Sequence, residues 1–300
     1  MSTLDRVVVQ ILPHVPRTVV RRISSRYIAG STLADALSTV RGLNARGARA
    51  TVDVLGEFIH ELQEATVATN SYVDLVDALA REQLDAQVSV KLTALGLLLD
   101  REACFGNVRR VVQAAAKAGN FVTIDMEDSS CTDATLDIFM RMRAETPNVG
   151  AVLQASLRRS RADLERIMDL APNVRVCKGI YIEPPAIAWQ TRDEVRASFL
   201  HLVDIMLGRP SFVGIATHDD YLVRSSLELL RKHGTPPERY EFQMLLGVRE
   251  ELRRELLAAG HPLRVYVPFG EHWYAYSLRR LKENPAVAGH VLRDLLDRRR

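Results

Sequence analysis

Charged side chains interrupt two short apolar runs of the sequence. Lys91 lies within V-S-V-K-L-T at 88–93, and Asp125 and Glu127 lie within I-D-M-E-D at 124–128. A lysine in an apolar run is rarely buried unless it is paired or functional. In an extended chain, period-two alternation puts Asp125 and Glu127 on the same face. We therefore expect Lys91 and Asp125 to form a buried pair with further partners, and the pattern leaves a structural role and a functional role open.

Further polar residues follow other apolar runs. Arg175 and Lys178 lie in R-V-C-K-G-I-Y and are followed by Gly179, and a glycine lets the backbone approach a ligand closely. Two cations beside a glycine predict a site for an anionic group, such as a phosphate or an electron-rich ring. Comparable positions in four other runs hold Gln154, Thr217 with His218, Glu241 with Gln243, and Tyr266. Because His218 has no second histidine at ligand spacing, a metal site is disfavoured.

Four residues near the end of the sequence share one predicted helical face. Tyr276, Arg279, Arg280 and Glu283 are spaced three or four residues apart, so their side chains are neighbours on a helix. Two guanidinium groups grip a carboxylate bidentately, and an aromatic ring packs on an apolar ring. The set therefore fits a small cyclic amino acid, with Glu283 balancing a positive nitrogen or holding the arginines. The same spacing also suits an ordinary exposed helix with an Arg–Glu pair.

Eight short runs rich in Val, Ile, Leu and aromatic residues are predicted to be the strands that position these groups. They are Ala50–Leu55, Ala86–Leu92, Phe121–Met126, Gly150–Ala155, Val174–Gly179, Phe212–Ala216, Tyr240–Leu245 and Leu263–Val267. Helical periodicity marks the stretches between them: Glu57–Glu64, Cys104–Ala118, Thr132–Glu145, Ser160–Leu170, Asp193–Leu207, Tyr221–His233 and Arg249–Ala259. This spacing is typical of βαβ units. Eight repeats predict an α/β fold with a closed (β/α)₈ barrel, since closure leaves no exposed sheet edge.

The barrel prediction has consequences for domains and for the site. No linker separates the repeats, so we expect one barrel domain over 48–300. An N-terminal helical arm over 1–47, with a helix at Ser31–Asn44, is expected to pack on the barrel. Catalytic groups of such barrels gather at the carboxyl ends of the strands. The charged residues above are expected at those ends.

Composition excludes several other classes of protein. With 40 basic and 37 acidic residues the net charge is only +3, which does not indicate a nucleic-acid partner. The three cysteines have no paired spacing, which argues against a disulfide framework or a structural zinc site. No G-x-G-x-x-G or P-loop motif occurs, so a nucleotide site of the Rossmann or P-loop type is not expected. No secretory signal and no apolar stretch of ~18 residues is seen, so a soluble cytoplasmic protein without a transmembrane segment is expected.

Seven segments together resemble the proline dehydrogenase family, which includes stand-alone bacterial enzymes and a domain of proline utilisation A. They run in family order: V-S-V-K-L-T at 88–93, I-D-M-E-D at 124–128, L-Q-A-S-L-R-R-S at 153–160, R-V-C-K-G-I-Y at 175–181, A-T-H-D at 216–219, E-F-Q-M-L-L-G-V-R at 241–249, and Y-V-P-F-G-E-H-W-Y-A-Y-S-L-R-R at 266–280. Each segment alone is a weak signal, but seven in order are highly specific.

The resemblance implies a distorted barrel that binds FAD non-covalently and has its last helix over the active site. Arg175 and Asp125 would be catalytic, with Arg175 near flavin N5. The implied substrate-binding residues are Lys91, Arg279 and Arg280 for the proline carboxylate, with Tyr276, Tyr266, Leu245 and Glu283 around them. The implied cofactor-binding residues are Met126, Gln154, Lys178, Gly179, Ile180, Thr217 and His218.

Two positions bear on how closely the chain follows the family. A small residue is usual where Ile180 stands, so the larger side chain is expected to alter the flavin contact or narrow the site. Tyr276 matches the pattern associated with L-proline, whereas a smaller residue there is associated with hydroxyproline enzymes.

The implied reaction is oxidation of L-proline to 1-pyrroline-5-carboxylate by hydride transfer to FAD, the first step of proline catabolism to glutamate. The resemblance also implies a membrane quinone as electron acceptor, peripheral association with the inner face of the membrane, and a separate 1-pyrroline-5-carboxylate dehydrogenase as partner. Two alternatives stay open from the residues: a Schiff-base lyase using Lys91 or Lys178, and a non-catalytic barrel that senses an amino acid.

Overall fold

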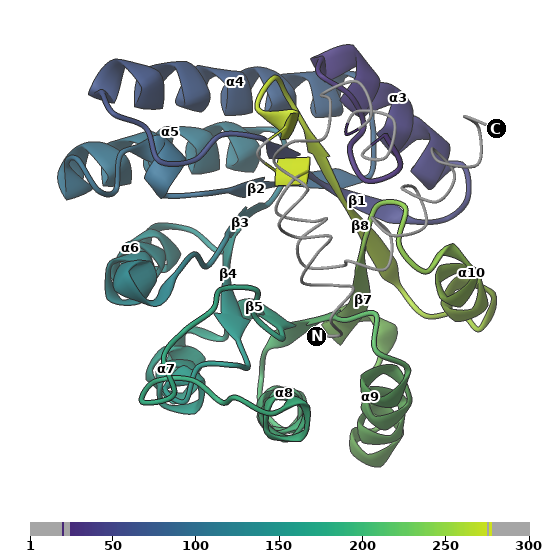
Figure 1. Cartoon of the computed structure of the whole chain (residues 1–300). Coiled ribbons are helices and arrows are strands. Elements are labelled where there is room, and N and C mark those ends of the chain that lie inside the picture. The colour runs from purple at the N-terminus through teal and green to yellow at the C-terminus, as the bar shows by residue number, and fades with distance from the viewer. Residues whose placement is uncertain (1–19, 21–24, 275, 278–300) are drawn as a thin grey trace, which may run out of the picture.

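The eight strands of the barrel run parallel and close on themselves in chain order (Figure 1). The computed structural model describes residues 20, 25–274, 276 and 277. The strands are β1 Arg49–Val54, β2 Ala86–Val90, β3 Val122–Ile124, β4 Val149–Gln154, β5 Asn173–Cys177, β6 Phe212–Ala216, β7 Tyr240–Leu245 and β8 Leu263–Phe269. β1 pairs with both β2 and β8. The predicted closed barrel is confirmed.

Eight named α-helices surround the strands within the described ranges. They are α3 Leu33–Asn44, α4 Leu62–Arg81, α5 Arg101–Lys117, α6 Thr132–Glu145, α7 Ser160–Ile167, α8 Arg192–Leu207, α9 Asp220–His233 and α10 Glu250–Ala258. Short 3₁₀ helices are η2 Thr93–Leu95, η3 Ser129–Cys131, η4 Met168–Leu170 and η5 Pro237–Arg239. α6, β6 and β7 have the predicted bounds, and β3 is shorter than predicted, since Asp125 and Met126 lie beyond its carboxyl end.

The helix after β1 is the element that the sequence prediction placed worst. Glu57–Glu64 was expected, whereas α4 spans Leu62–Arg81. Its start is set by a capping box, in which the side chains of Glu61 and Glu64 each accept a backbone N–H of the other residue. The residues before Leu62 form a loop, and Phe58 has a left-handed φ of 52° there. Capping therefore decided this boundary.

The helix that precedes β1 completes the ring around the barrel. α3 packs against β1 and β8 and buries Ala36, Leu37, Val40 and Leu43, and Figure 1 shows it beside these two strands. It takes the position between β8 and β1 that a helix following β8 would occupy in a regular barrel. Of the predicted last helix, residues 273, 274, 276 and 277 are described and are helical, and the rest lies outside the described residues. The boundary between residues 47 and 48 stays a prediction.

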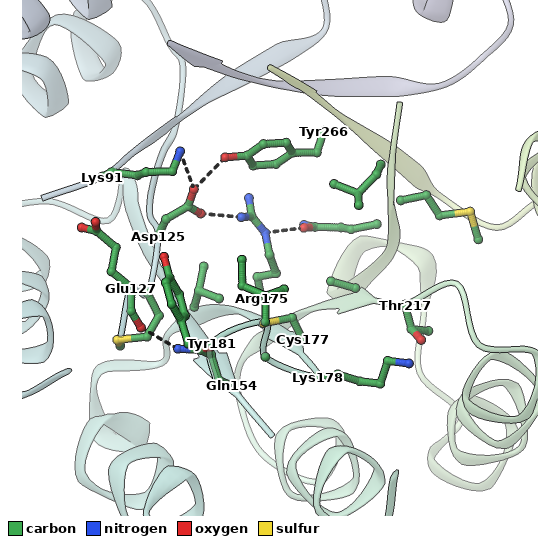
Figure 2. A pocket seen from close by; sticks show the side chains of 18 of the residues that line it. Lys91, Asp125, Glu127, Gln154, Arg175, Cys177, Lys178, Tyr181, Thr217 and Tyr266 are labelled. Atoms are coloured by element: carbon green, nitrogen blue, oxygen red, sulfur yellow. Dashed lines mark hydrogen bonds and ion pairs between the residues drawn. The ribbon is translucent and has the colours of Figure 1, made fainter. Parts of the chain in front are cut away.

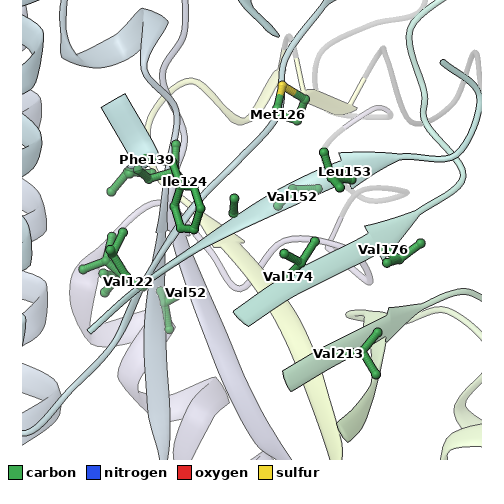
Figure 3. Packing of buried hydrophobic residues seen from close by; sticks show 14 of the residues in the cluster. Val52, Val122, Ile124, Met126, Phe139, Val152, Leu153, Val174, Val176 and Val213 are labelled. Atoms are coloured by element: carbon green, nitrogen blue, oxygen red, sulfur yellow. The ribbon is translucent and has the colours of Figure 1, made fainter. Parts of the chain in front are cut away.

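The two faces of the strands carry different kinds of buried side chain: apolar ones face the helices, and polar ones face the barrel interior. The apolar core lies between strands and helices and includes Val52, Val122, Ile124, Val174 and Val176 (Figure 3). Alternate residues face the barrel interior, where Gln87 donates to the hydroxyls of Thr51 and Thr123 at 3.3 and 3.1 Å. Typical barrels of this kind fill their interior with branched apolar residues. Here a buried polar interior leads up to the carboxyl ends of the strands.

Candidate active site

A pocket of about 280 Å³ opens at the carboxyl ends of the strands (Figure 2). The residues that line it include thirteen of the predicted site residues: Lys91, Asp125, Met126, Gln154, Arg175, Lys178, Gly179, Ile180, Thr217, His218, Leu245, Tyr266 and Tyr276. Arg279, Arg280 and Glu283 lie outside the described residues. The fold thus brings residues from seven strands and the segment after β8 to one place, and their individual roles stay predictions.

Lys91 is held mainly by a residue that the sequence prediction missed. Its Nζ lies 2.6 Å from Asp53 Oδ2, whereas Asp125 Oδ2 is 3.9 Å away and Glu57 Oε1 is 4.0 Å away. The expected pair of Lys91 with Asp125 is present as an ion pair, but the hydrogen bond of Lys91 goes to Asp53 and not to Asp125. Asp53 is a charged residue within the apolar run A-T-V-D-V-L. The same kind of signal drew attention to Lys91, so it could also have identified Asp53.

The oxygens of Asp125 are occupied by other donors. Oδ1 accepts from Arg175 Nη1 at 2.6 Å and from the Ser89 hydroxyl at 2.7 Å. Oδ2 accepts from the Tyr266 hydroxyl at 2.8 Å. These contacts leave Asp125 as the carboxylate that joins β2, β3, β5 and β8, and Lys91 turns to Asp53 on β1.

Electrostatics favour the charged forms of Lys91 and Asp125, whereas at Asp53 burial outweighs the effect of Lys91 and raises the pKa. Burial alone would lower the pKa of Lys91, but the carboxylates of Asp53, Asp125 and Glu57 outweigh it and raise that pKa. Burial would likewise raise the pKa of Asp125, but Arg175 and Lys91 bring it below its ordinary value. Burial and the nearby carboxylates raise the pKa of Tyr266 well above its usual range, so its phenol stays protonated and donates.

Arg175 crosses the middle of the barrel. Its Nε donates to Gln243 Oε1 at 2.7 Å, on the side away from Asp125, and its guanidinium carbon lies 5.3 Å from the centre of the Tyr266 ring. Figure 2 shows the guanidinium beside Asp125 and below the Tyr266 ring. A buried guanidinium with two of its edges fixed presents a defined positive group to the pocket.

The other side of the pocket carries a cation and a glycine turn that suit an anionic ligand. Gly179 has φ +98°, and a Cβ there would lie 2.2 Å from Ser156 Oγ, so only glycine fits this turn. Lys178 is 3.6 Å from Asp219, and the side chain of Gln154 donates to the carbonyl of Glu127 at 2.7 Å. His218 Nε2 accepts the backbone N–H of Leu245 at 2.9 Å, which leaves the ring proton of the neutral imidazole on Nδ1.

Several lining residues were not among the predicted site residues. They are Glu57, Glu127, Val152, Cys177, Tyr181, Ala216, Gln243 and Met244. Glu127 and Gln243 stood out as polar residues at strand ends, but the short apolar ones carry no signal in a single sequence. Val152, Cys177 and Ala216 supply apolar surface beside the cations. Together with Arg175, Lys178 and the Gly179 turn, they fit a flavin, whose ring is apolar and whose diphosphate is anionic.

Ile180 lies at the edge of this pocket. Its side chain is 43% exposed, and it follows directly on the Gly179 turn. The expectation that it alters the flavin contact is untested and stays a prediction.

The fold and the site define the class of the protein. It is a (β/α)₈ barrel whose pocket, at the catalytic face of such barrels, holds a buried cluster of cations, carboxylates and a tyrosine. Clusters of this kind with perturbed pKa values are typical of enzyme active sites.

Comparison with known proteins narrows this class to one family. The family model for proline dehydrogenase matches residues 36–293. Proline dehydrogenase 1 of Bacillus subtilis subsp. natto is 38% identical over 271 residues, which are 90% of each chain. Proline dehydrogenase of Deinococcus radiodurans is 34% identical over 279 residues, 91% of this chain and 90% of that one. The chain belongs to the proline dehydrogenase family, and the resemblance seen in the sequence is confirmed.

Solved structures show the same fold in larger proteins. Proline utilisation A from Bdellovibrio bacteriovorus, inactivated by N-propargylglycine, superposes with a TM-score of 0.84 at 24% identity. The match covers 92% of this chain and 36% of that one. The bifunctional protein PutA of Escherichia coli is 26% identical, over 91% of this chain and 24% of its own length. This chain therefore spans about a quarter to a third of these proteins.

Proposed function

We propose that this chain oxidises L-proline to 1-pyrroline-5-carboxylate on a bound FAD, as the first step of proline catabolism to glutamate. Membership of the proline dehydrogenase family supports the reaction. The observation that carries the proposal is that residues from separate motifs meet in one pocket. This pocket contains both the guanidinium of Arg175, held by Asp125, and the ammonium of Lys91, held by Asp53.

On the substrate side, the carboxylate of proline would lie near Lys91. The raised pKa keeps that side chain an ammonium at neutral pH, so it attracts an anion although Asp53 already holds it. Tyr276 is buried in a cluster with Ile28, Leu55 and Trp273 and lines the pocket, where its ring can pack on the pyrrolidine. Arg279 and Arg280 complete this clamp in the proposal, together with Glu283.

On the cofactor side, Arg175 would stabilise negative charge that develops near flavin N5. Bound FAD would supply a two-electron acceptor for the hydride from proline. Lys178, Gln154 and the Gly179 turn would hold the cofactor, with Thr217 and His218 beside them. Tyr266 and Asp125 would keep the Arg175 guanidinium in place.

The bond changes in proline balance as follows. The C5–H bond breaks and its electron pair leaves as hydride, the amine nitrogen loses a proton to solvent, and a C5=N double bond forms. Hydride loss requires a neutral amine, and positioning of C5 by the carboxylate clamp lowers the barrier. The two electrons would pass to a quinone, and a separate 1-pyrroline-5-carboxylate dehydrogenase would consume the product.

The quinone acceptor implies a cytoplasmic protein that associates peripherally with the membrane. None of the described helices is both long and apolar enough to cross a bilayer. The proposal therefore concerns contact with a membrane surface, and reduction of a soluble quinone by the proline-reduced protein, with and without vesicles, would test it.

A Schiff-base mechanism at Lys91 loses support from the electrostatics of that residue. A Schiff-base lysine must be a neutral amine when it attacks, which requires a lowered pKa. The carboxylates around Lys91 raise its pKa instead. No observation specifically favours the sensor alternative.

The visible spectrum of the purified protein under anaerobic L-proline tests the proposed function. We expect the absorption bands of bound flavin, and we expect proline to bleach them. A protein that stays colourless after incubation with FAD would contradict the proposal. Flavin bands that persist while proline binds, measured by calorimetry, would instead support a sensor.

A further inference from the structure

Three buried polar side chains lie beside Arg175 in the barrel interior and have no part in the mechanism above. Glu241 and Gln243 are on β7, and Arg264 is on β8; their residues are 1%, 9% and 8% exposed. Gln243 reaches the pocket lining. Glu241 lies two residues earlier on β7, deeper in the barrel, because alternate strand residues share a face.

These side chains form a continuous chain of hydrogen bonds that ends at Arg175. Arg264 Nε donates to Glu241 Oε1 at 2.6 Å, and Gln243 Nε2 donates to the same oxygen at 2.8 Å. Gln243 Oε1 then accepts from Arg175 Nε at 2.7 Å. The carboxylate of Glu241 is thus separated from Arg175 by one primary amide.

The charges at the two ends of this chain determine how the Gln243 amide is oriented. A carboxylate only accepts hydrogen bonds and a guanidinium only donates them, whereas an amide has one end of each kind. Reversing the amide would set its NH₂ against Arg175 and its oxygen against Glu241, so both hydrogen bonds would be lost. Glu241 therefore keeps the amide oxygen turned towards Arg175.

Gly214 on β6 provides the space for this amide. A Cβ at this position would lie 2.5 Å from Gln243 Nε2 and 3.4 Å from the Cα of Arg175. Gly214 is paired with Arg175 on one side and with Glu241 on the other. The lack of a side chain at Gly214 therefore leaves room for the Gln243 amide between β5 and β7, and no unusual φ is involved.

The amide also leaves the charge of Arg175 incompletely neutralised. On its Nη1 edge the guanidinium meets the carboxylate of Asp125, which Lys91 also approaches. On its Nε edge it meets a neutral oxygen, although a glutamate would fit the same volume. A second carboxylate here would cancel the positive charge that the pocket offers to a ligand.

We infer that Glu241 is a positioning residue that acts through Gln243, and that Gln243 and Gly214 fix the orientation of Arg175 while leaving its charge available to the pocket. The orientation is a property of the folded chain. Its effect on catalysis rests on the proposed function, because only there does Arg175 face a flavin that gains negative charge.

The first test measures the orientation without any ligand. In full-length protein labelled with ¹⁵N-arginine, the Arg175 Nε–H signal is assigned by its loss in R175K, and its exchange with solvent is measured. We expect slow exchange in the unmodified protein and at least about tenfold faster exchange in Q243L and G214A, because the acceptor is removed or displaced. Unchanged exchange in both variants would overturn the inference.

Q87L is the matched control for Q243L. Gln87 is also an interior glutamine, 8% exposed, but it bonds to Thr51 and Thr123 and not to Arg175. Q87L should destabilise the fold without changing Arg175 exchange. Faster Arg175 exchange in Q87L, equal to that in Q243L, would show a general loosening of the interior and would contradict a specific role for Gln243.

The role of Glu241 is tested in a double variant, because E241Q alone would leave the buried guanidinium of Arg264 without its carboxylate partner and could unfold the protein. The double variant E241Q/R264Q removes both charges. We expect Arg175 exchange between the rates of the unmodified protein and Q243L, because the amide of residue 243 is then free to reverse. An exchange rate equal to that of the unmodified protein would overturn the role assigned to Glu241.

The second test uses the FAD-loaded enzyme and asks whether the neutral side chain of Gln243 leaves the charge of Arg175 available to the pocket. In Q243E we expect kcat for proline oxidation to fall by about tenfold or more, with KM within about threefold, because charge stabilisation is lost and proline binding is not. Bound FAD should also become harder to reduce in a spectroscopic redox titration. An unchanged potential and unchanged kcat would overturn the charge argument. If the unmodified protein neither binds FAD nor oxidises proline, the proposed function fails, while the exchange measurements still decide the orientation.

Discussion

The ion pair of Lys91 with Asp53 is more deeply buried than the contacts of Lys91 with Glu57 and Asp125. Its two side chains are joined at 2.6 Å and come from adjacent strands. Tyr72 from α4 donates to the other oxygen of Asp53 at 3.1 Å. Asp53 therefore links the outer helix to the ammonium that is proposed to attract the substrate.

Substitution of Asp53 by Asn should cost the protein about 3–5 kcal/mol of unfolding free energy, because a buried ammonium loses its closest counter-charge. Denaturant unfolding at neutral pH measures this loss. Glu57 offers the control: it is 4.0 Å from Lys91, so E57Q should cost clearly less than D53N, because the Coulomb attraction weakens with distance. Equal losses in the two variants would show that Asp53 is not the principal partner.

The acid limb of stability should report on Asp125. Its pKa is lowered in the folded protein, mainly by Arg175 against the opposing effect of burial. The stability contributed by its charge is therefore full above the ordinary pKa of 3.8 and is lost as the pH falls through the lower folded value. We expect the difference in unfolding free energy between the unmodified protein and D125N to be constant from pH 7 to about pH 5 and to narrow below 3.8. A difference that widens on acidification would reverse the sign of this shift.

At the scale of elements, the turn after β5 is the segment whose shape matters most to the pocket. Gly179 has a left-handed φ and sits against Ser156 of the neighbouring β4–α7 loop. Gly119, after α5, also has a left-handed φ of 64°, but an added Cβ would meet nothing within 4 Å. An alanine would strain the backbone at both positions, but it would clash with a neighbouring side chain only at Gly179.

Gly179→Ala should therefore be more harmful than Gly119→Ala. Backbone strain alone costs about 1–2 kcal/mol in each, and G179A adds a clash that displaces the loop beside the pocket. We expect weakened FAD binding in G179A only, measured by the fluorescence change on titration with FAD. Equal affinities in the two variants would argue against Gly179 as part of the cofactor site.

The element predictions failed where capping or tertiary packing overrode periodicity. Strands and most helices were predictable because alternation and helical periodicity are local properties of the chain. The start of α4 was not, since it depends on the reciprocal bonds of Glu61 and Glu64. The bounds of β3 were overextended because Asp125 and Met126 continue its pattern after the ladder has ended.

At the scale of the whole molecule, α3 acts as a member of the barrel although it precedes the first strand. It covers β1 and β8 with four buried apolar or alanine side chains. In Figure 1 it lies in the ring of helices between α4 and α10. The predicted N-terminal arm therefore includes a helix that packs on the barrel between β8 and β1.

A chain that starts at residue 48 should fold poorly, because it exposes the apolar outer faces of β1 and β8. We expect it to lose clearly more thermal stability than a chain that starts at residue 25, which keeps α3. Thermal unfolding followed by circular dichroism makes this comparison. Equal melting temperatures would show that the stability of the barrel does not depend on α3.

The sequence by itself determined the barrel, the family and the residue types of the site. Alternation and turn chemistry are encoded locally, and seven motifs in order are sufficient to recognise a family. Thirteen predicted site residues consequently lie around one pocket.

Only the tertiary structure decided the pairing of these residues. In the folded chain Lys91 pairs most closely with Asp53, Arg175 lies between Asp125 and Gln243, and α3 packs in the ring of helices around the barrel. Contacts across a barrel depend on strand order, register and the space left by residues such as Gly214. These quantities arise from the closed fold as a whole, and no local stretch of sequence encodes them.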